Sequence, residues 1–141
     1  MNDADFVLDA SVVMAWCFED ESSFYADAVL ESLSNHTAIV PAVWPLEISN
    51  VLIVAERRGR IDKAGSARFI NLIAQLPITV EQELWQRVFA EIMALAREYI
   101  LSSYDASYLD LAMRLGLPLA TQDVRLRNAA QSAGVLLYLD E

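Results

Sequence analysis

A short apolar run near the start of the chain, Phe6-Val7-Leu8, ends on the carboxylate of Asp9, and a helix-like apolar pattern begins directly after it. This order is typical of a buried parallel strand that carries an acid to its carboxyl end. Ligands of open α/β sheets bind at that edge, so Asp9 lies where chemistry is expected. A simpler interpretation, which the strand alone leaves open, is that Asp9 only caps the helix that follows.

Similar short apolar runs alternate with helical patterns along the whole chain. We expect further strands at 38–40, 78–80, 117–121 and 135–139. We expect the helices between them at 10–18, 23–33, 43–58, from a cap at Asp62, over about 84–96, and at 106–115 and 124–133. This alternation predicts one domain over residues 1–141, an α/β fold with a three-layer α/β/α sandwich around a mainly parallel, roughly five-stranded sheet.

Three helices carry specific packing predictions. Ser22 is expected to cap helix 23–33, with Phe24, Ala28 and Leu33 buried, and the helix after Asp62 is expected to turn Ala64, Phe69, Leu72 and Ile73 inward. The long helix has Leu84, Val88, Ile92, Leu95 and Ala96 at helical spacing, and Trp85, Phe89 and Met93 are expected to pack in the core or in an interface.

Composition limits the compartment. The single cysteine, Cys17, allows no internal disulfide and fits a reducing environment. Charged or amide residues interrupt every apolar segment before it reaches membrane-spanning length, and the acidic N-terminus is unlike a signal peptide. We therefore expect a cytoplasmic protein with no membrane partner.

Several common sites are excluded. The four glycines have neither GxGxxG nor Walker spacing, so nucleotide sites of those types are absent. His36 is the only histidine, which excludes a histidine-rich zinc site and a His-pair nuclease. A Ser-His-Asp triad would need this same histidine, which lies in a polar loop.

The charge is unevenly distributed. The formal net charge is −10, which taken alone argues against nucleic acid and for a cationic partner or a bound metal. Residues 1–56 contain no Lys or Arg, and then basic residues cluster at Arg57, Arg58, Arg60, Lys63 and Arg68. This basic cluster is either a solvated surface or a patch that faces RNA phosphates or a partner.

Carboxylates are the chemistry that remains. Glu47 lies in the first turns of a helix, Asp105 opens another, and Asp123 follows the 117–121 strand. In a parallel sheet these positions share one edge with Asp9. Four carboxylates together repel one another unless a hard cation such as Mg²⁺ or Mn²⁺ binds. From spacing alone, the alternative that Asp105 and Asp123 are helix caps and Glu47 a solvated residue stays open.

Four segments resemble the PIN-domain family, most closely the VapC-type toxins of type II toxin–antitoxin pairs. They are FVLDAS (6–11), PAVWPLEISNVL (41–52), YDASYL (104–109) and LPLATQDVRL (117–126), and the closing 129–130, 134–135 and final strand also fit. The resemblance implies a metal-dependent endoribonuclease toxin that cleaves RNA phosphodiester bonds with metal-activated water, leaving 5′-phosphate and 3′-hydroxyl ends.

The resemblance also assigns roles to individual residues. It implies that Asp9, Asp105 and Asp123 hold Mg²⁺ or Mn²⁺, directly or through water, and that Glu47 completes the catalytic quartet through water or by helping a second ion. Ser11 and Thr121 match hydroxyl positions that steady the carboxylates or the scissile phosphate. Asn50, one helical turn after Glu47, faces the same way and is implied as a supporting or substrate contact.

The resemblance implies two protein partners besides the RNA substrate: a cognate antitoxin that neutralises the toxin, and a second copy in a homodimer. We expect the antitoxin on the first third of the chain, at Trp16, Phe18, Phe24, Tyr25 and the acidic 19–21, and the dimer contact at Trp85, Phe89 and Met93. Asp110 departs from the family pattern and is expected at the surface or in a partner contact. A catalytically silent PIN-like binding module, or a metal-dependent phosphatase or DNA nuclease, stays an alternative.

Overall fold

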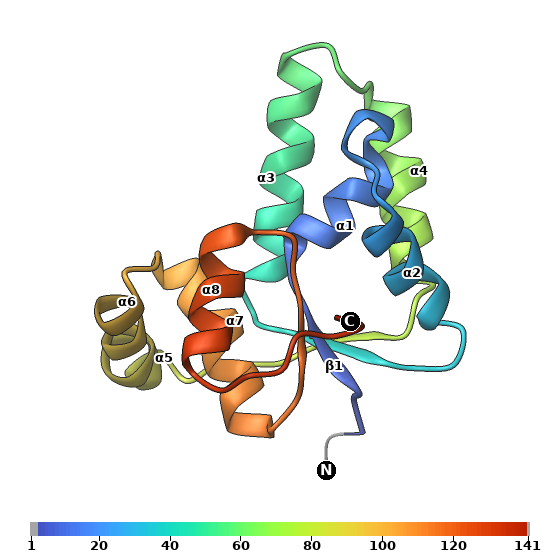
Figure 1. Ribbon diagram of the computed structural model, residues 1–141. Helices are drawn as coiled ribbons and strands as arrows, with labels where there is room; N and C mark the ends of the chain where they lie inside the picture. Colours follow the sequence, from blue (N-terminus) through green and yellow to red (C-terminus); the bar gives the residue numbers. More distant parts are fainter. Residues whose placement is uncertain (1–2, 141) are drawn as a thin grey trace.

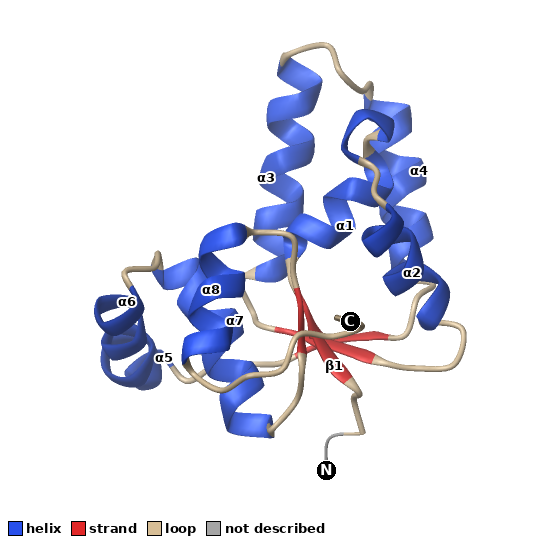
Figure 2. Ribbon diagram, in the orientation of Figure 1, coloured by secondary structure: helices blue, strands red, loops and turns tan. Residues whose placement is uncertain are grey.

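A computed structural model describes residues 3–140, and within them four strands form one sheet (Figures 1 and 2). The strands are β1 (Phe6–Leu8), β2 (Ala38–Val40), β3 (Ile78–Val80) and β4 (Leu119–Ala120). Their order is β3-β2-β1-β4 and every pairing is parallel, with Phe6 opposite Ala38 and Val7 opposite Leu119. The expected strand at 135–139 is reduced to one parallel bridge between Leu119 and Leu137, because the chain turns at Leu139 with φ at 56°.

Helices cover both faces of this sheet, which confirms the three-layer α/β/α architecture. One group is α1 (Ala10–Cys17), the short η1 (Glu19–Glu21), α2 (Phe24–Ser32), α3 (Trp44–Arg57) and α4 (Lys63–Ala74). The other is α5 (Trp85–Arg87), the π-helical η2 (Val88–Ile92), α6 (Met93–Tyr99), α7 (Ser103–Leu115) and α8 (Val124–Ser132). Because parallel crossovers are right-handed, the steps β1 to β2 to β3 place the first group on one face, and the return to β4 places the second on the other (Figure 1).

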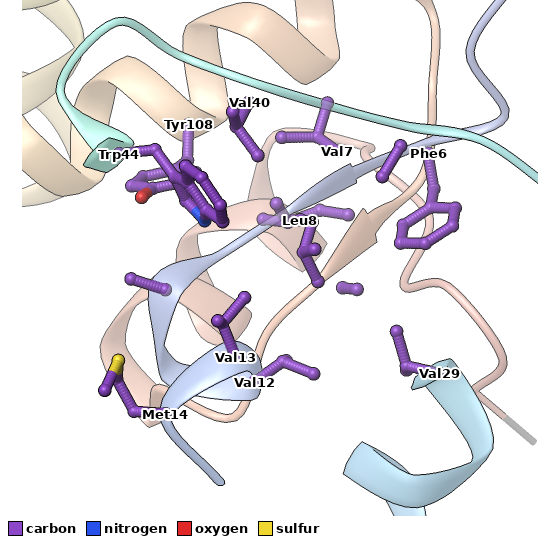
Figure 3. Close-up of a cluster of buried hydrophobic side chains, with 14 of the residues drawn as sticks. Phe6, Val7, Leu8, Val12, Val13, Met14, Val29, Val40, Trp44 and Tyr108 are labelled. Carbon is purple, nitrogen blue, oxygen red and sulfur yellow. The ribbon is translucent and has the colours of Figure 1, made fainter. Parts of the chain in front are cut away.

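The strands are short because they lie wholly inside the core. The three β1 side chains are 0% exposed and pack against Val12 and Val13 of α1 (Figure 3). The Tyr138 ring stacks on Phe6 with the ring centroids 3.8 Å apart, so the C-terminal segment closes the same core. The residues that follow β1 and β4 therefore leave from a tightly packed frame.

Helix α7 brings a buried face against this frame. Ser102 caps it by accepting a hydrogen bond from the amide of Asp105, and Gly116 ends it in the left-handed region at φ 66°. Ala106 and Leu109 are completely buried, and the helix contacts both β1 and β4. Its first turn therefore lies close to the carboxyl ends of these strands.

The packing predictions for α2 and α4 are partly wrong. Ser23, not Ser22, caps α2, because its hydroxyl accepts from the amide of Ala26. The buried positions of α2 and its C-cap are Ala26, Val29 and Leu33, whereas Phe24 is 97% exposed and Ala28 is exposed as well. Asp62 does cap α4, as predicted. Phe69 and Ile73 are buried there, but Ala64 and Leu72 face outward because Ser66 takes the third inward position.

The predicted long helix is confirmed as one continuous helical run through α5, η2 and α6, with π-helical geometry in its middle part at Val88–Ile92. Of its expected inward residues, Ile92 is buried, Val88, Leu95 and Ala96 are partly buried, and Leu84 is 67% exposed. Trp85 and Phe89 are each 66% exposed and contact one another edge to face, so packing in the core of this chain is excluded for both. Their place in an interface stays a prediction.

Asp110 is not a surface residue, so the prediction made for it is wrong. Its side chain is 7% exposed and accepts two hydrogen bonds from Arg87, at 2.8 and 2.9 Å. Arg114 approaches the same carboxylate at 3.6 Å, while Glu83 and Glu91 also pair with Arg87. This ion-pair network fastens the end of α5 to the middle of α7.

We expect Asp110→Asn to lower the free energy of unfolding by about 2 kcal/mol, because it removes the buried charge that pairs in bidentate fashion with the partly buried guanidinium of Arg87. Urea denaturation measures the effect. The matched control is Asp20→Asn, which removes an exposed partner of Arg60 and should leave the urea midpoint nearly unchanged. Equal, small shifts in both variants would show that the buried pair adds no stability.

Candidate active site

Asp9 stands at the carboxyl end of β1 and turns its side chain toward β4. Its Oδ2 accepts a hydrogen bond from the hydroxyl of Ser11 and another from that of Thr121, both at 2.7 Å. Asp9 occupies the N-cap position of α1 but makes no capping hydrogen bond with its side chain, so the interpretation that it only caps this helix is wrong. Burial raises the pKa of Asp9, the two hydroxyl groups oppose that shift, and the charge of Asp123 adds to it.

Glu47 reaches the same edge from the first turn of α3. Its Oε1 accepts a hydrogen bond of 2.6 Å from the hydroxyl of Tyr108, which projects from α7 beside Trp44 (Figure 3). Partial burial raises the pKa of Glu47, and the charges of Asp9 and Asp105 raise it further. Glu47 is therefore held by another side chain and is not a freely solvated helix residue.

Asp105 lies in the first turn of α7. Because Ser102 is the cap of this helix, the alternative that Asp105 serves as the cap is also wrong. Burial, then the charges of Asp9 and Asp123, raise the pKa of Asp105 to about 6, while the positive charge of Arg125 lowers it. Asp105 therefore keeps its proton to a higher pH than an ordinary aspartate does, and a nearby positive charge favours its ionised form.

Asp123 is both a helix cap and a member of the carboxylate cluster. Its Oδ1 accepts from the amide of Leu126 and so caps α8, as the simpler alternative proposed. Its own amide donates to the hydroxyl of Thr121, and the amide of Gln122 donates to that of Ser11. The loop after β4 is thus tied to the end of β1, and Asp123 is within Coulomb range of both Asp9 and Asp105.

The structure brings the four predicted carboxylates together at one edge of the sheet, each from a different element. Within residues 3–140, however, no three acidic, histidine or cysteine side chains are arranged to hold one metal ion in common. A carboxylate offers about four acceptor sites, so the hydrogen bonds described above leave further oxygen lone pairs for a ligand. An all-oxygen, mutually repelling set of this kind suits a hard divalent cation.

Asn50 faces the same way as Glu47, because both line one cavity of about 470 Å³ at the start of α3. The basic cluster lies elsewhere. Arg57 is ten residues beyond Glu47, which is about 15 Å along the helix, at the far end of α3 (Figure 1). Arg60 is paired with Asp20 and Glu21 and stacks over Phe18. The structure therefore does not bring this cluster to the carboxylates.

Two residues near the carboxylates were missed by the sequence analysis. Tyr108 comes three residues after Asp105 and so shares its side of α7, but its aromatic ring fits the apolar pattern and hides the role of its hydroxyl. Arg125 follows Asp123 by two residues and is exposed on the first turn of α8. Its position at the start of a helix and next to an acid could have indicated from the sequence that it lies at the site.

No described helix is both long and apolar enough to cross a membrane.

The chain as a whole is similar to known proteins. The chain is 28% identical over 121 residues to ribonuclease VapC3 of Pyrobaculum aerophilum, covering 85% of this chain and 90% of that protein. The crystal structure of PAE2754 from the same organism superposes with a TM-score of 0.71 at 26% identity, covering 90% of this chain and 85% of that one. A toxin–antitoxin complex from Klebsiella pneumoniae shares the fold, with a TM-score of 0.59 at 18% identity over 84% and 87% of the two chains. The PIN domain family model matches residues 6–131, and the chain belongs to the PIN domain family.

Proposed function

We propose that this protein is a divalent-metal-dependent endoribonuclease, the toxin of a type II toxin–antitoxin pair. The observation that carries the proposal is the meeting of Asp9, Glu47, Asp105 and Asp123 at one sheet edge, with raised pKa values for the first three. The likeness to a ribonuclease VapC over most of both chains supports RNA as the substrate.

Asp9, Asp105 and Asp123 are the residues that would hold Mg²⁺ or Mn²⁺, in part through water, and Glu47 would complete the set. Glu47 and Asp105 lie in the first turns of α3 and α7, where the helix dipoles favour their negative charge. The ion would supply Lewis-acid chemistry that stabilises charge developing on the phosphate and makes a nearby water more acidic.

The chain's own residues position the reacting groups. Ser11 and Thr121 fix the orientation of the Asp9 carboxylate, and Tyr108 fixes that of Glu47. Arg125, exposed beside Asp105, can meet a non-bridging oxygen of the scissile phosphate or of its neighbour. With these residues orienting the carboxylates and contacting the phosphate, the proposed cleavage of the phosphodiester bond needs no histidine side chain.

The proposed antitoxin and dimer contacts gain partial support. Phe24 is almost fully exposed on α2, but Phe18 is buried beneath Arg60, and Trp16 donates its indole N–H to the backbone of Ala26. The antitoxin surface in the first third is therefore smaller than the sequence indicated. The exposed pair Trp85 and Phe89 provides apolar surface of the kind a homodimer would bury.

We expect single-stranded RNA to be cleaved with Mg²⁺ or Mn²⁺ and not in EDTA. Asp9→Asn and Asp105→Asn should each slow cleavage at least about 100-fold, the scale on which one transition-state contact matters. Gel-resolved rates on RNA, DNA of the same sequence and a phosphomonoester measure this. Undiminished cleavage in the variants would refute the mechanism, and cleavage of DNA or the monoester alone would favour the alternative enzymes. Binding of RNA with no cleavage under any metal would favour the silent module.

The raised pKa of Asp105 predicts an effect on stability without metal. Between its ordinary value of 3.8 and about 6, the folded state binds the proton more tightly, so stability should rise as pH falls through this range. Near neutral pH in EDTA, Asp105→Asn should therefore stabilise the protein by about 1 kcal/mol, a discounted figure because the group is half exposed to screening water.

Thermal melts with and without Mn²⁺ measure this balance. The added ion should raise the melting temperature of the wild type more than that of Asp105→Asn, because it binds the folded carboxylates. If the ion stabilises both proteins equally, Asp105 is not a ligand, whatever the activity measurements show.

We expect Tyr108→Phe to lower the cleavage rate by about 10-fold or more, since it removes the hydrogen bond that orients the Glu47 carboxylate. The control is Tyr138→Phe, which removes a hydroxyl that donates to Ser32 at the end of α2 and contacts none of the four carboxylates. Single-turnover rates and the Mn²⁺ concentration for half-maximal activity measure both variants. Equal losses in the two would reduce the role of Tyr108 to general packing.

A further inference from the structure

A cavity beside Glu47 is lined by side chains that the proposed carboxylate chemistry does not require. Its volume is about 470 Å³, within the range of small-molecule sites. Its walls are Val43, Leu46, Glu47, Asn50, Val51 and Tyr104, from the first two turns of α3 and the start of α7. Glu47, a member of the carboxylate cluster, therefore forms part of the wall of this cavity.

Two of these wall residues are large apolar groups that the core does not use. Leu46 is 70% exposed and Tyr104 is 60% exposed. Trp44 and Tyr108, from the first turns of the same two helices, are buried. These helices can therefore bury large apolar side chains, so the packing of the helices does not require Leu46 and Tyr104 to be exposed. Leu46 and Tyr104 directly precede Glu47 and Asp105 in the chain, so each places an apolar group next to a carboxylate.

The charge of this wall decides what can occupy the cavity. A phosphate would be repelled by Glu47 and by the acids around it, whereas a neutral planar group would not. Unpaired RNA bases are recognised by stacking on aromatic rings and by hydrogen bonds to their edges. Tyr104 offers such a ring, and the exposed amide of Asn50 carries both a donor and an acceptor.

We propose that this cavity receives an unpaired nucleobase of the RNA next to the scissile phosphate. Tyr104 stacks on the base, Leu46 contacts its other apolar surface, and Asn50 bonds to its edge. This subsite rests on the proposed ribonuclease function, because Glu47 connects it to the carboxylates that act on the phosphate. It would make the enzyme prefer particular bases at one position beside the cleaved bond.

Equilibrium binding of a short fluorescent RNA tests the subsite without any turnover. EDTA prevents metal-dependent cleavage, and the comparison strand has the same sugar-phosphate backbone with no bases. Tyr104→Ala should weaken binding of the base-bearing RNA about 10-fold, as expected for one lost stacking contact, and leave the abasic strand unaffected. Leu46→Ala should act in the same direction.

Two control variants match the changes. Tyr104→Phe keeps the ring and should bind like the wild type. Leu136→Ala removes a leucine of similar exposure, 78% against 70% for Leu46, which lines a separate cavity with Gly116 and Pro118 at the opposite end of β4. It should leave both affinities unchanged.

Mapping of cleavage sites on an RNA of mixed sequence, with Mn²⁺, gives a second measurement. The wild type and Tyr104→Phe should share one base preference at a position flanking the cut. Tyr104→Ala and Asn50→Ala should cut with a flatter preference, while their dependence on Mn²⁺ stays that of the wild type.

The outcomes separate this inference from the proposed function. If the wild type binds and cleaves RNA but Tyr104→Ala and Leu46→Ala behave like it, or weaken normal and abasic strands equally, the base subsite is wrong and the ribonuclease stands. If those variants leave RNA binding unchanged but weaken binding of a protein partner, the cavity belongs to that partner. If the wild type neither binds nor cleaves RNA, both proposals fall.

Discussion

Two hydroxyl groups hold the carboxylate of Asp9 between the ends of β1 and β4, and the geometry of the whole site depends on this contact. Ser11 and Thr121 both donate to the same oxygen at 2.7 Å, and each accepts a backbone amide of the loop after β4. A buried carboxylate is costly unless hydrogen bonds compensate for the lost water. The same bonds that offset that cost also align the starts of α1 and α8, so the site and the fold share one set of contacts.

The other carboxylates stand where their charge is only partly compensated. Tyr108 serves Glu47, Arg125 moderates Asp105, and the helix starts contribute their dipoles. These contacts do not cancel the repulsion, because the pKa values of Glu47 and Asp105 stay raised. A cluster that is destabilising in isolation is understandable where a bound cation completes it, since sites of function commonly sacrifice stability.

The sequence predicted which carboxylates meet at the carboxyl ends of the strands, but it did not predict the contacts of Asp110 or the exposure of Phe24. The difference has a physical reason. Strand ends and helix starts follow from local patterns, and in a parallel sheet they must share one edge, so the meeting of Asp9 with Asp105 and Asp123 could be expected. The burial of Asp110 could not, because it depends on Arg87 arriving from a distant helix that contains a π-helical turn. Phe24 was misplaced because its size suggested the inward face of α2, whereas the face that packs on the core carries the smaller Ala26 and Val29.

The strongly acidic composition restricts how such a protein can hold RNA. Ordinary RNA-binding surfaces gain affinity from Lys and Arg on phosphates, with steep salt dependence. Here the basic cluster lies at the far end of α3, and Arg60 within it is already paired with two acids. Under the proposed function, affinity for RNA near the carboxylates would come from divalent ions, from Arg125 and from contacts with neutral bases. An acidic edge flanked by exposed apolar groups such as Leu46 and Tyr104 meets that requirement, because stacking does not need positive charge and is little weakened by salt.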